Sequence, residues 1–385
     1  NLINLSYTDN ATHPALVRQT LELGEKYGVS SFVYDSYIRN RAGDSGVTFN
    51  DLAKSMANYY RYKSFGGIYL VDEPTTSDYN VSESVAGNTN EMGNYQYLSR
   101  VLHENNICGY SNLLPLLHTR VINNYRAYVQ TAANVYNPLF LSFDRYAYEP
   151  YWGQDTKKAF FTNVDIIRSE AENYNLPFWA YVQAGGQFND NPEAWPASQP
   201  LYPTEGQMHW NINVLLASGA KGIEYFPIIQ PYYFAQKQGN AYDFTRNGLF
   251  GADGSQNQWY GYAKKANQQI AAIDSVLMNS VNKGVIVSGT NATSDVQGLS
   301  YIMSGKSWRQ LSNVTGDAMI GCFNYNGKTA LYVVNYKDSS TNTITLNFSS
   351  TYNVKMIKNA ATSYMTVSSL SLPMAAGEGA LLVFE

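Results

Sequence analysis

Short hydrophobic runs alternate with longer amphipathic stretches between residues 2 and 228, and this alternation constrains the fold more than any other feature. Seven runs have strand-like length and residue types: LINLSY (2–7), SSFVYDS (30–36), GIYLVDE (67–73), ICGYSN (107–112), LFLSFDRY (139–146), PFWAYVQA (177–184) and KGIEYFPI (221–228). Between them lie stretches with apolar residues at helical spacing, including 14–28, 50–64, 123–136 and 206–220. Hydrophobic strands separated by helices indicate parallel strands joined by right-handed crossovers.

The spacing of about 30 to 45 residues per strand-and-helix unit predicts a (β/α)8 TIM barrel. A doubly wound open sheet is the alternative, but the Gly-rich phosphate-binding turn that such sheets carry after the first strand does not occur here. A barrel has eight strands and seven are recognisable in the sequence. We therefore expect the first barrel strand to lie upstream of residue 1.

A second domain is indicated where the pattern changes, after a strongly helical segment at 258–279. Short alternating strands and turn signals follow, among them the hairpin dipeptide Asn326-Gly327. The strand-like runs are 284–289, 298–303, 319–336, 343–348, 352–358 and 379–385. The sequence thus predicts a catalytic barrel over 1–282 and a C-terminal antiparallel β-sandwich over 283–385, an accessory domain without catalytic residues.

The charge pattern excludes one class of partner, and the cysteines are few. The chain has 26 basic and 30 acidic residues and no Lys/Arg stripe, so nucleic acid is not expected as a partner. No apolar run reaches membrane-spanning length. Cys108 and Cys322 are expected to be free buried thiols rather than a disulfide. We expect no cofactor, and a bacterial protein that is secreted, periplasmic or at the cell surface, with its signal segment outside this chain.

The chemistry is expected at the carboxyl ends of the strands, where the loops of barrel enzymes form the active site. The four histidines show no metal-ligand spacing, so no metal site is predicted. Carboxylates together with amides and aromatic rings are the groups that glycoside hydrolysis requires. The predicted strand ends carry Tyr34, Asp35, Asp72, Glu73, Ser111, Asn112, Asp144, Tyr146, Tyr181, Gln183 and Tyr225.

The paired acids Asp72 and Glu73, in VDEP (71–74), are the most specific of these features. Glu73 is the candidate general acid, and its pKa is then expected to be raised by burial and by the neighbouring carboxylates. If the strand continued to Glu73, the two side chains would point to opposite faces. The alternative interpretation is that both acids merely cap the turn before Pro74.

The order of VDEP (71–74), SFDRY (142–146), WAYVQAGG (179–186) and LLASGAKGIEYF (215–226) resembles clan A glycoside hydrolases. The nearest likeness is to the family 42 β-galactosidases and related uncharacterised barrel proteins. It extends to residues 247–270, which look like the final barrel helix, and to GEGALLVF (377–384) in the sandwich. The resemblance implies that Glu73 occupies the acid/base position at the end of the fourth barrel strand.

The chain departs from that pattern at the nucleophile, because Gln183 stands where the resemblance implies a glutamate. Three possibilities remain: an inverting mechanism with Asp144 or Asp35 as the base, a displaced nucleophile such as Glu149 or Glu224, or no catalysis. Glu224 is ranked below Asp144 because Lys221 lies near it in sequence and it could point outward. We therefore predict a glycoside hydrolase with Glu73 and Asp144 as catalytic residues; the alternative is a non-catalytic carbohydrate-binding protein on the same barrel. The predicted substrate-binding residues are Tyr34, Asp35, Asp72, Asn112, Tyr146, Glu149, Trp179, Tyr181, Gln183 and Tyr225.

Overall fold

The computed structural model describes residues 2–74, 91–116, 124–148, 156–185, 203–229, 236–238, 241–243 and 248–385. The chain divides into two compact units. Unit 1 comprises Asn1–Asp144 and Glu170–Pro177, and unit 2 comprises Arg145–Ser169 and Phe178–Glu385. Within the described ranges, no helix has the length and apolar character that a membrane crossing requires.

All seven predicted parallel strands are present, and their order in the sheet follows their order in the chain. Helices occur between them, as in a (β/α) barrel, and an antiparallel domain follows, so the predicted fold class is confirmed. The eighth strand, expected upstream, stays a prediction. The bounds are β1 Leu2–Asp9, β2 Ser30–Tyr34, β3 Phe65–Asp72, β4 Gly109–Leu113, β5 Leu141–Phe143, β6 Phe178–Gln183 and β7 Gly222–Phe226.

The helices follow the predicted amphipathic stretches, but two end earlier than predicted, the one at 206–220 at Ala217. The stretch predicted at 50–64 is helical only to Met56, and the chain then turns so that Tyr59 reaches a buried carboxylate described below. The helices are α1 Pro14–Tyr27, α2 Ser36–Arg39, α3 Phe49–Met56, α4 Glu91–Glu104, α5 Tyr125–Tyr136, α6 Thr156–Asn173, α7 Glu205–Ala217 and α8 Gln258–Leu277.

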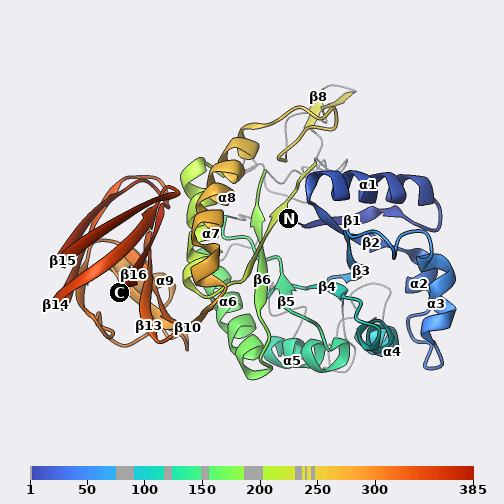
Figure 1. The fold of residues 1–385 in the computed structure, drawn as a ribbon, viewed down its shortest axis with the longest axis horizontal. Coiled ribbons are helices and arrows are strands. Elements are labelled where there is room, and N and C mark those ends of the chain that lie inside the picture. Colours follow the sequence, from blue (N-terminus) through green and yellow to red (C-terminus); the bar gives the residue numbers. More distant parts are fainter. Residues whose placement is uncertain are drawn as a thin grey trace. The chain divides into compact units, whose positions relative to one another are not determined.

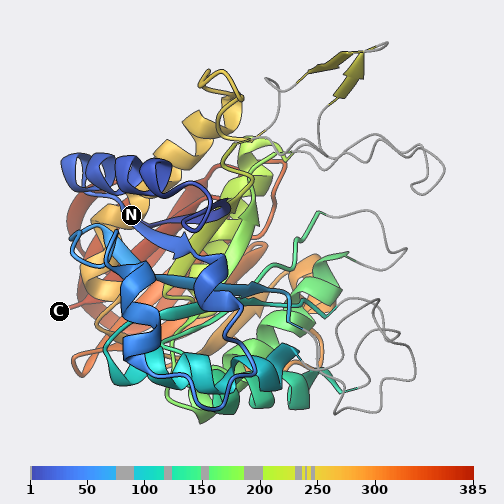
Figure 2. The ribbon, with the colours of Figure 1, turned by 90° about the vertical axis from the view of Figure 1, so that its right-hand side faces the viewer.

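In unit 1 the strands separate an aromatic face from an aliphatic face. Phe32, Tyr69 and Tyr110, on three adjacent strands, form one buried cluster, and the rings of Phe32 and Tyr110 stack with centroids 4.7 Å apart. We call this side of β2–β4 the aromatic face. On the other side, a Cβ at Gly109 would collide with Leu70, which packs there because glycine leaves the space. Figure 2 shows the blue helices of this unit in front of its strands.

The antiparallel strands of unit 2 form a sheet with a buried core of its own, and we call this part of unit 2 the antiparallel domain. The run predicted at 298–303 is not a strand, and the runs 343–348 and 352–358 belong to one long strand, β14, whose pairing with β15 shifts register between Asn347 and Tyr352. Strand β15 was not predicted, although hydrophobic residues alternate along it with Ser, Thr and Pro: Met365, Val367, Leu370, Leu372 and Met374 pack against the core, and the pattern is interrupted at Ser368 and Ser369. The elements are β10 Ser280–Ser288, α9 Thr290–Asp295, β11 Leu311–Thr315, β12 Ala318–Tyr325, β13 Lys328–Asn335, β14 Asn342–Lys358, β15 Ala361–Met374 and β16 Gly379–Phe384, with a separate short pair β8 Gln236–Gln238 and β9 Ala241–Asp243.

Helices α6 and α7 are fixed to the antiparallel domain by buried polar contacts within unit 2. Asn213 of α7 accepts a hydrogen bond from the Tyr332 hydroxyl at 2.6 Å and donates one to the Gly377 carbonyl at 2.8 Å. Lys157 of α6 pairs with Asp338 at 2.7 Å, and its ammonium lies 4.5 Å from the centre of the Trp210 ring. Figure 1 shows α7 and α8 beside the strands of the antiparallel domain.

Candidate active site

The polar residues at the ends of β3, β4 and β5 form one row on unit 1. In the strand register, Asp72 is opposite Asn112, and Asn112 is opposite Ser142. The Ser142 hydroxyl donates to the Asn112 amide oxygen at 3.3 Å, and the Asn112 amide nitrogen donates to Asp72 at 3.3 Å. Tyr110 contacts the Ser142 hydroxyl at 3.2 Å. These hydrogen bonds fix the orientation of the Asn112 amide group.

A one-residue bulge in β3 turns Asp72 toward the aromatic face. Tyr69 is opposite Tyr110, but the next register pair is Val71 with Ser111, so Leu70 is an extra residue in β3. Without it, alternation would place Asp72 on the side opposite to Tyr69. With it, Asp72 accepts hydrogen bonds from both Tyr69 and Asn112. Bulges often redirect side chains next to active sites.

Glu73 lies just beyond β3 in a left-handed backbone conformation. Its φ is +46°, which is unusual for a residue other than glycine and costs on the order of 1 to 3 kcal/mol. Its N–H donates to the Asn112 carbonyl at 2.9 Å, and the Tyr128 hydroxyl donates to the carbonyl of Pro74 at 2.6 Å. The strand alternation expected for the paired acids therefore ends at Asp72. The surrounding contacts hold Glu73, which is half-buried, in this strained position.

The Asp72 carboxylate has a raised pKa although the side chain reaches solvent. The main cause is loss of hydration among the surrounding protein atoms, and it outweighs the hydrogen bonds from Asn112 and Tyr69 and the positive charge of Arg39, which lower the pKa. Arg39 donates to the Tyr34 hydroxyl at 2.7 Å and to the Tyr95 hydroxyl at 3.2 Å. It thereby connects Tyr34, at the end of β2, to this region.

Replacing Asp72 with asparagine is expected to make the protein more stable at neutral pH. Because the Asp72 pKa is raised in the folded state, the folded protein binds that proton more tightly, and stability falls as pH rises from the unfolded value through the folded value. The asparagine side chain keeps an acceptor for Tyr69 and Asn112 without this penalty. Urea unfolding of both proteins from pH 3.5 to pH 8 measures the difference, which should grow with pH. A stability difference that stays constant across this pH range would show that the Asp72 pKa is not raised in the folded protein.

Asp35 is not retained as a substrate-binding residue or as a catalytic base, because its side chain is fully buried. It caps α2 by accepting from the N–H groups of Tyr37 and Ile38, at 3.0 and 3.4 Å. Its carboxylate also accepts from side chains of Asn10, Ser55 and Tyr59, at 3.1, 2.5 and 2.9 Å. Every one of these partners belongs to the protein, so Asp35 organises the end of β2 rather than contacting a ligand.

Asp144 directly follows β5 and is half-buried. Like Asp72 and Asn112, it lies at the carboxyl end of its strand. In unit 1, Asp72 and Glu73 thus lie at the end of β3 and Asp144 at the end of β5, with β4 between these two strands. The roles of Asp144 and Glu73 stay predictions. Glu149 lies outside the described residues.

In unit 2, the polar and aromatic residues at the strand ends divide between two faces. Trp179, Tyr181 and Gln183 are every second residue of β6 and therefore lie on one side of it. Tyr181 is opposite Glu224 in β7. The Phe226 ring makes an edge contact with Tyr181, at 6.5 Å between centroids. Glu224 therefore lies on the same side of β7 as Phe226, two positions away, so it does not point outward as the sequence suggested.

Two of the aromatic residues predicted to bind substrate contact other side chains of the protein instead. Tyr225 alternates with Glu224 and Phe226, and its hydroxyl donates to Asn267 of α8 at 2.7 Å, so it faces the helix. Tyr146 is buried and stacks with Phe226, at 6.3 Å between centroids. Trp179 and Tyr181 are half-buried, and Gln183 is buried and donates to the Gly185 carbonyl at 3.0 Å. These contacts do not support the predicted role of Tyr146 and Tyr225 in substrate binding.

Sequence reasoning missed Ser142, Tyr69 and Arg39, which orient the Asp72 region. A Ser within SFDRY gives little signal in the sequence, and the contact of Tyr69 with Asp72 depends on the bulge. In the described part of the chain, no three His, Cys, Asp or Glu side chains form a group that could hold a metal ion.

No family model matches the chain, and no curated protein matches it. Among solved structures, a noncanonic maltogenic α-amylase, AmyB from Thermotoga neapolitana, is similar with 12% identity, a TM-score of 0.44 and coverage of 100% of this chain and 98% of that chain. A GH30 endoxylanase from Clostridium papyrosolvens C71 has 10% identity, a TM-score of 0.44 and coverage of 96% and 83%. A β-galactosidase from Marinomonas ef1 has 16% identity, a TM-score of 0.37 and coverage of 71% and 45%. Similarities this low assign no residue role to this chain.

Proposed function

We propose that this protein is a glycoside hydrolase in which Glu73 is the general acid and Asp144 the general base. The observation that carries the proposal is the placement of Asp72 and Glu73 at the end of β3 and of Asp144 at the end of β5, two strands along in the same sheet of unit 1, with Asp72 redirected by a bulge and Glu73 held at a positive φ. A strained acidic residue beside an oriented amide favours a reactive site over a capping role.

In the proposed reaction, Glu73 gives its proton to the glycosidic oxygen as the bond from the anomeric carbon to that oxygen breaks. Water forms the new bond to the anomeric carbon, and Asp144 takes the proton that the water releases. Gln183 carries no carboxylate that could form a glycosyl ester, which favours this single displacement with inversion. Asp72 and Tyr34 offer hydrogen bonds to sugar hydroxyl groups near the reacting bond, and the buried Asn112 orients Asp72.

The substrate class rests on the chemistry of the donors and acceptors. The Tyr34 hydroxyl is neutral, and Asp72 is an acceptor when ionised, a combination suited to sugar hydroxyl groups. The identity of the sugar and the linkage is tested by a panel of aryl glycosides and polysaccharides. No turnover of any member, together with retained binding to one of them, would favour the non-catalytic carbohydrate-binding alternative.

The mechanism is tested with the best substrate of that panel by following the anomeric protons by NMR from the first turnover. We expect the product to appear first with the anomeric configuration opposite to that of the substrate. Asp144→Asn should lower kcat by about 10² to 10⁴, because the attacking water then has no base. Asp274→Asn, an exposed substitution on α8, is the matched control. Retention of configuration, or full activity of Asp144→Asn, would exclude Asp144 as the base.

A further inference from the structure

Two adjoining hollows occupy the side of unit 2 where α7 and α8 meet the antiparallel domain. The first, of about 630 Å³, lies on the antiparallel domain itself, and the second, of about 510 Å³, extends to α7 and α8. They share Asn359, Ala375 and Glu378, and together we call them the Glu378 groove. Each volume lies within the range of about 300 to 1,000 Å³ that is usual for small-molecule sites.

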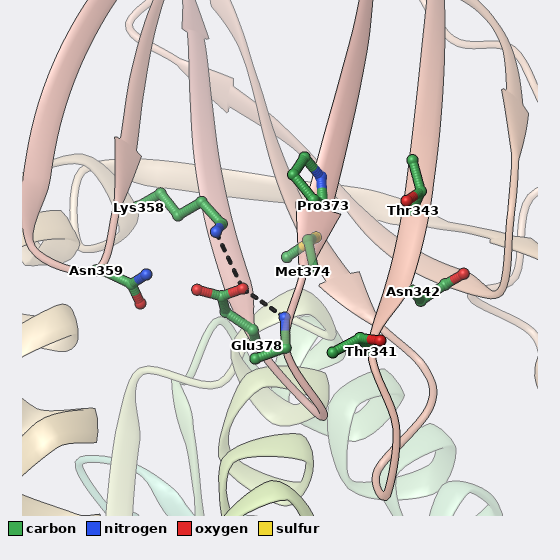
Figure 3. A pocket seen from close by; sticks show the side chains of 9 residues that line it. Thr341, Asn342, Thr343, Lys358, Asn359, Pro373, Met374 and Glu378 are labelled. Atoms are coloured by element: carbon green, nitrogen blue, oxygen red, sulfur yellow. Dashed lines mark hydrogen bonds and ion pairs between the residues drawn. The ribbon is translucent and has the colours of Figure 1, made fainter.

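Glu378 lies at the centre of this groove and its orientation is fixed. One carboxylate oxygen accepts from the Lys358 ammonium at 3.1 Å and from the Ala375 N–H at 2.8 Å. The Glu378 side chain is only 12% exposed and that of Lys358 is 23% exposed. Figure 3 shows Lys358 and Asn359 on one side of Glu378, and Thr341, Asn342 and Thr343 on the other.

His209 lines the second hollow, and its imidazole is fixed in one tautomer. Its Nε2 lies 3.1 Å from the Tyr262 carbonyl, which can only accept, so Nε2 carries the proton. Burial lowers the pKa of His209, with Lys265 acting in the same direction and the Tyr262 carbonyl, Glu205 and Glu378 opposing it, so the ring is neutral at pH 7. Its Nδ1 is then a hydrogen-bond acceptor.

The charges of the groove balance. Glu205 of α7 pairs with Lys265 of α8 at 2.6 Å, as Glu378 pairs with Lys358. The amide of Gln268 and the hydroxyl groups of Thr341 and Thr343 add further uncharged donors and acceptors. A ligand with net charge of either sign would find no unpaired opposite charge among these groups. A neutral molecule with many hydroxyl groups would find both donors and acceptors along the groove.

We propose that the Glu378 groove binds a short stretch of a neutral polysaccharide chain, as a binding site composed of residues other than the candidate catalytic ones. The choice of polysaccharide as the ligand rests on the proposed function, whereas the preference for a neutral polyol rests on the groove itself. Such a site retains a long substrate on the protein between cleavage events and lengthens its residence there.

The test is native gel electrophoresis through gels containing soluble polysaccharides, which gives a dissociation constant from the retardation of the protein. Neutral xylan, mixed-linkage β-glucan and starch are compared with anionic polygalacturonate. All proteins carry Glu73→Gln, so that the gel matrix is not degraded. Lys265→Ala removes an exposed donor, Ala375→Trp fills the part shared by both hollows, and Lys264→Ala, an exposed neighbour outside the groove, is the matched control.

We expect retardation by at least one neutral polysaccharide, weakened about five- to tenfold in Lys265→Ala and more strongly in Ala375→Trp, with Lys264→Ala unchanged. The proposal is overturned by equal binding of all four proteins, by retardation only in polygalacturonate, or by no retardation in any gel. Hydrolysis by the protein with native Glu73 is measured separately, so a failure of the groove and a failure of the proposed function are distinguishable.

Discussion

Glu73→Gln should lower kcat on glycosides with unactivated leaving groups by about 10² to 10⁴, because glutamine has the same shape but no proton to donate. Substrates with acidic phenol leaving groups, which depart without protonation, should lose much less. The ratio of the two losses is the informative quantity, since a general disturbance of the site would slow both classes of substrate alike. Steady-state kinetics on a series of aryl glycosides with graded leaving-group pKa values measures this ratio.

Glu104→Gln, a substitution of an exposed glutamate near the end of α4, is the matched control and should keep the parental kinetics. If the protein cleaves a glycan and Glu73→Gln cleaves it at the same rate, the acids of VDEP have a structural role and the site is elsewhere. In that case Glu224, on the same side of β7 as Phe226, is the next acid to replace.

Asp35→Ala should reduce the free energy of unfolding by about 3 to 5 kcal/mol. The substitution removes the N-cap of α2, which typically contributes about 0.5 to 2 kcal/mol, and leaves the buried donors of Tyr59 and Asn10 without their acceptor, at about 1 to 3 kcal/mol each. Urea unfolding followed by far-UV circular dichroism gives the value. Tyr59→Phe, which removes one hydroxyl, should cost roughly 1 kcal/mol.

Asp44→Ala is the control for this comparison, because Asp44 is an exposed aspartate whose carboxylate accepts from a single backbone N–H, that of Gly46, at 2.9 Å. It should change stability by about 0.5 kcal/mol or less. An Asp35→Ala protein that unfolds at the parental urea concentration would show that the buried network contributes little, and would reopen the question of whether Asp35 contacts a ligand.

The acids themselves were recognisable in the sequence, but the direction in which they point was not. Alternation along β3 would place Asp72 away from the aromatic face, and only the extra residue Leu70 reverses this. A bulge depends on how one strand pairs with the next, so it leaves no mark in the local pattern of hydrophobic residues. The same holds for Glu224, whose side of β7 follows from the contact of Phe226 with Tyr181.

Burial divided residues that looked equivalent in the sequence. Asp35 directly follows β2 and Asp72 is the last residue of β3, and both were assigned to substrate binding, yet Asp35 is fully buried and Asp72 is exposed. The difference arises because Asn10 and the pair Ser55 and Tyr59, from two separate parts of the chain, converge on Asp35. Polar partners brought together by the tertiary fold cannot be counted from neighbouring residues.

The sequence by itself determined the seven parallel strands, the helices between them and the change to antiparallel strands near residue 280, because strand and helix periodicities are local and each run must bury its hydrophobic residues. It also identified the strand ends that carry acids. The tertiary structure alone decided the bulge in β3, the left-handed conformation of Glu73 and the structural role of Asp35. Each of these depends on contacts between segments far apart in the chain, where the energies of packing and hydrogen bonding outweigh local preference.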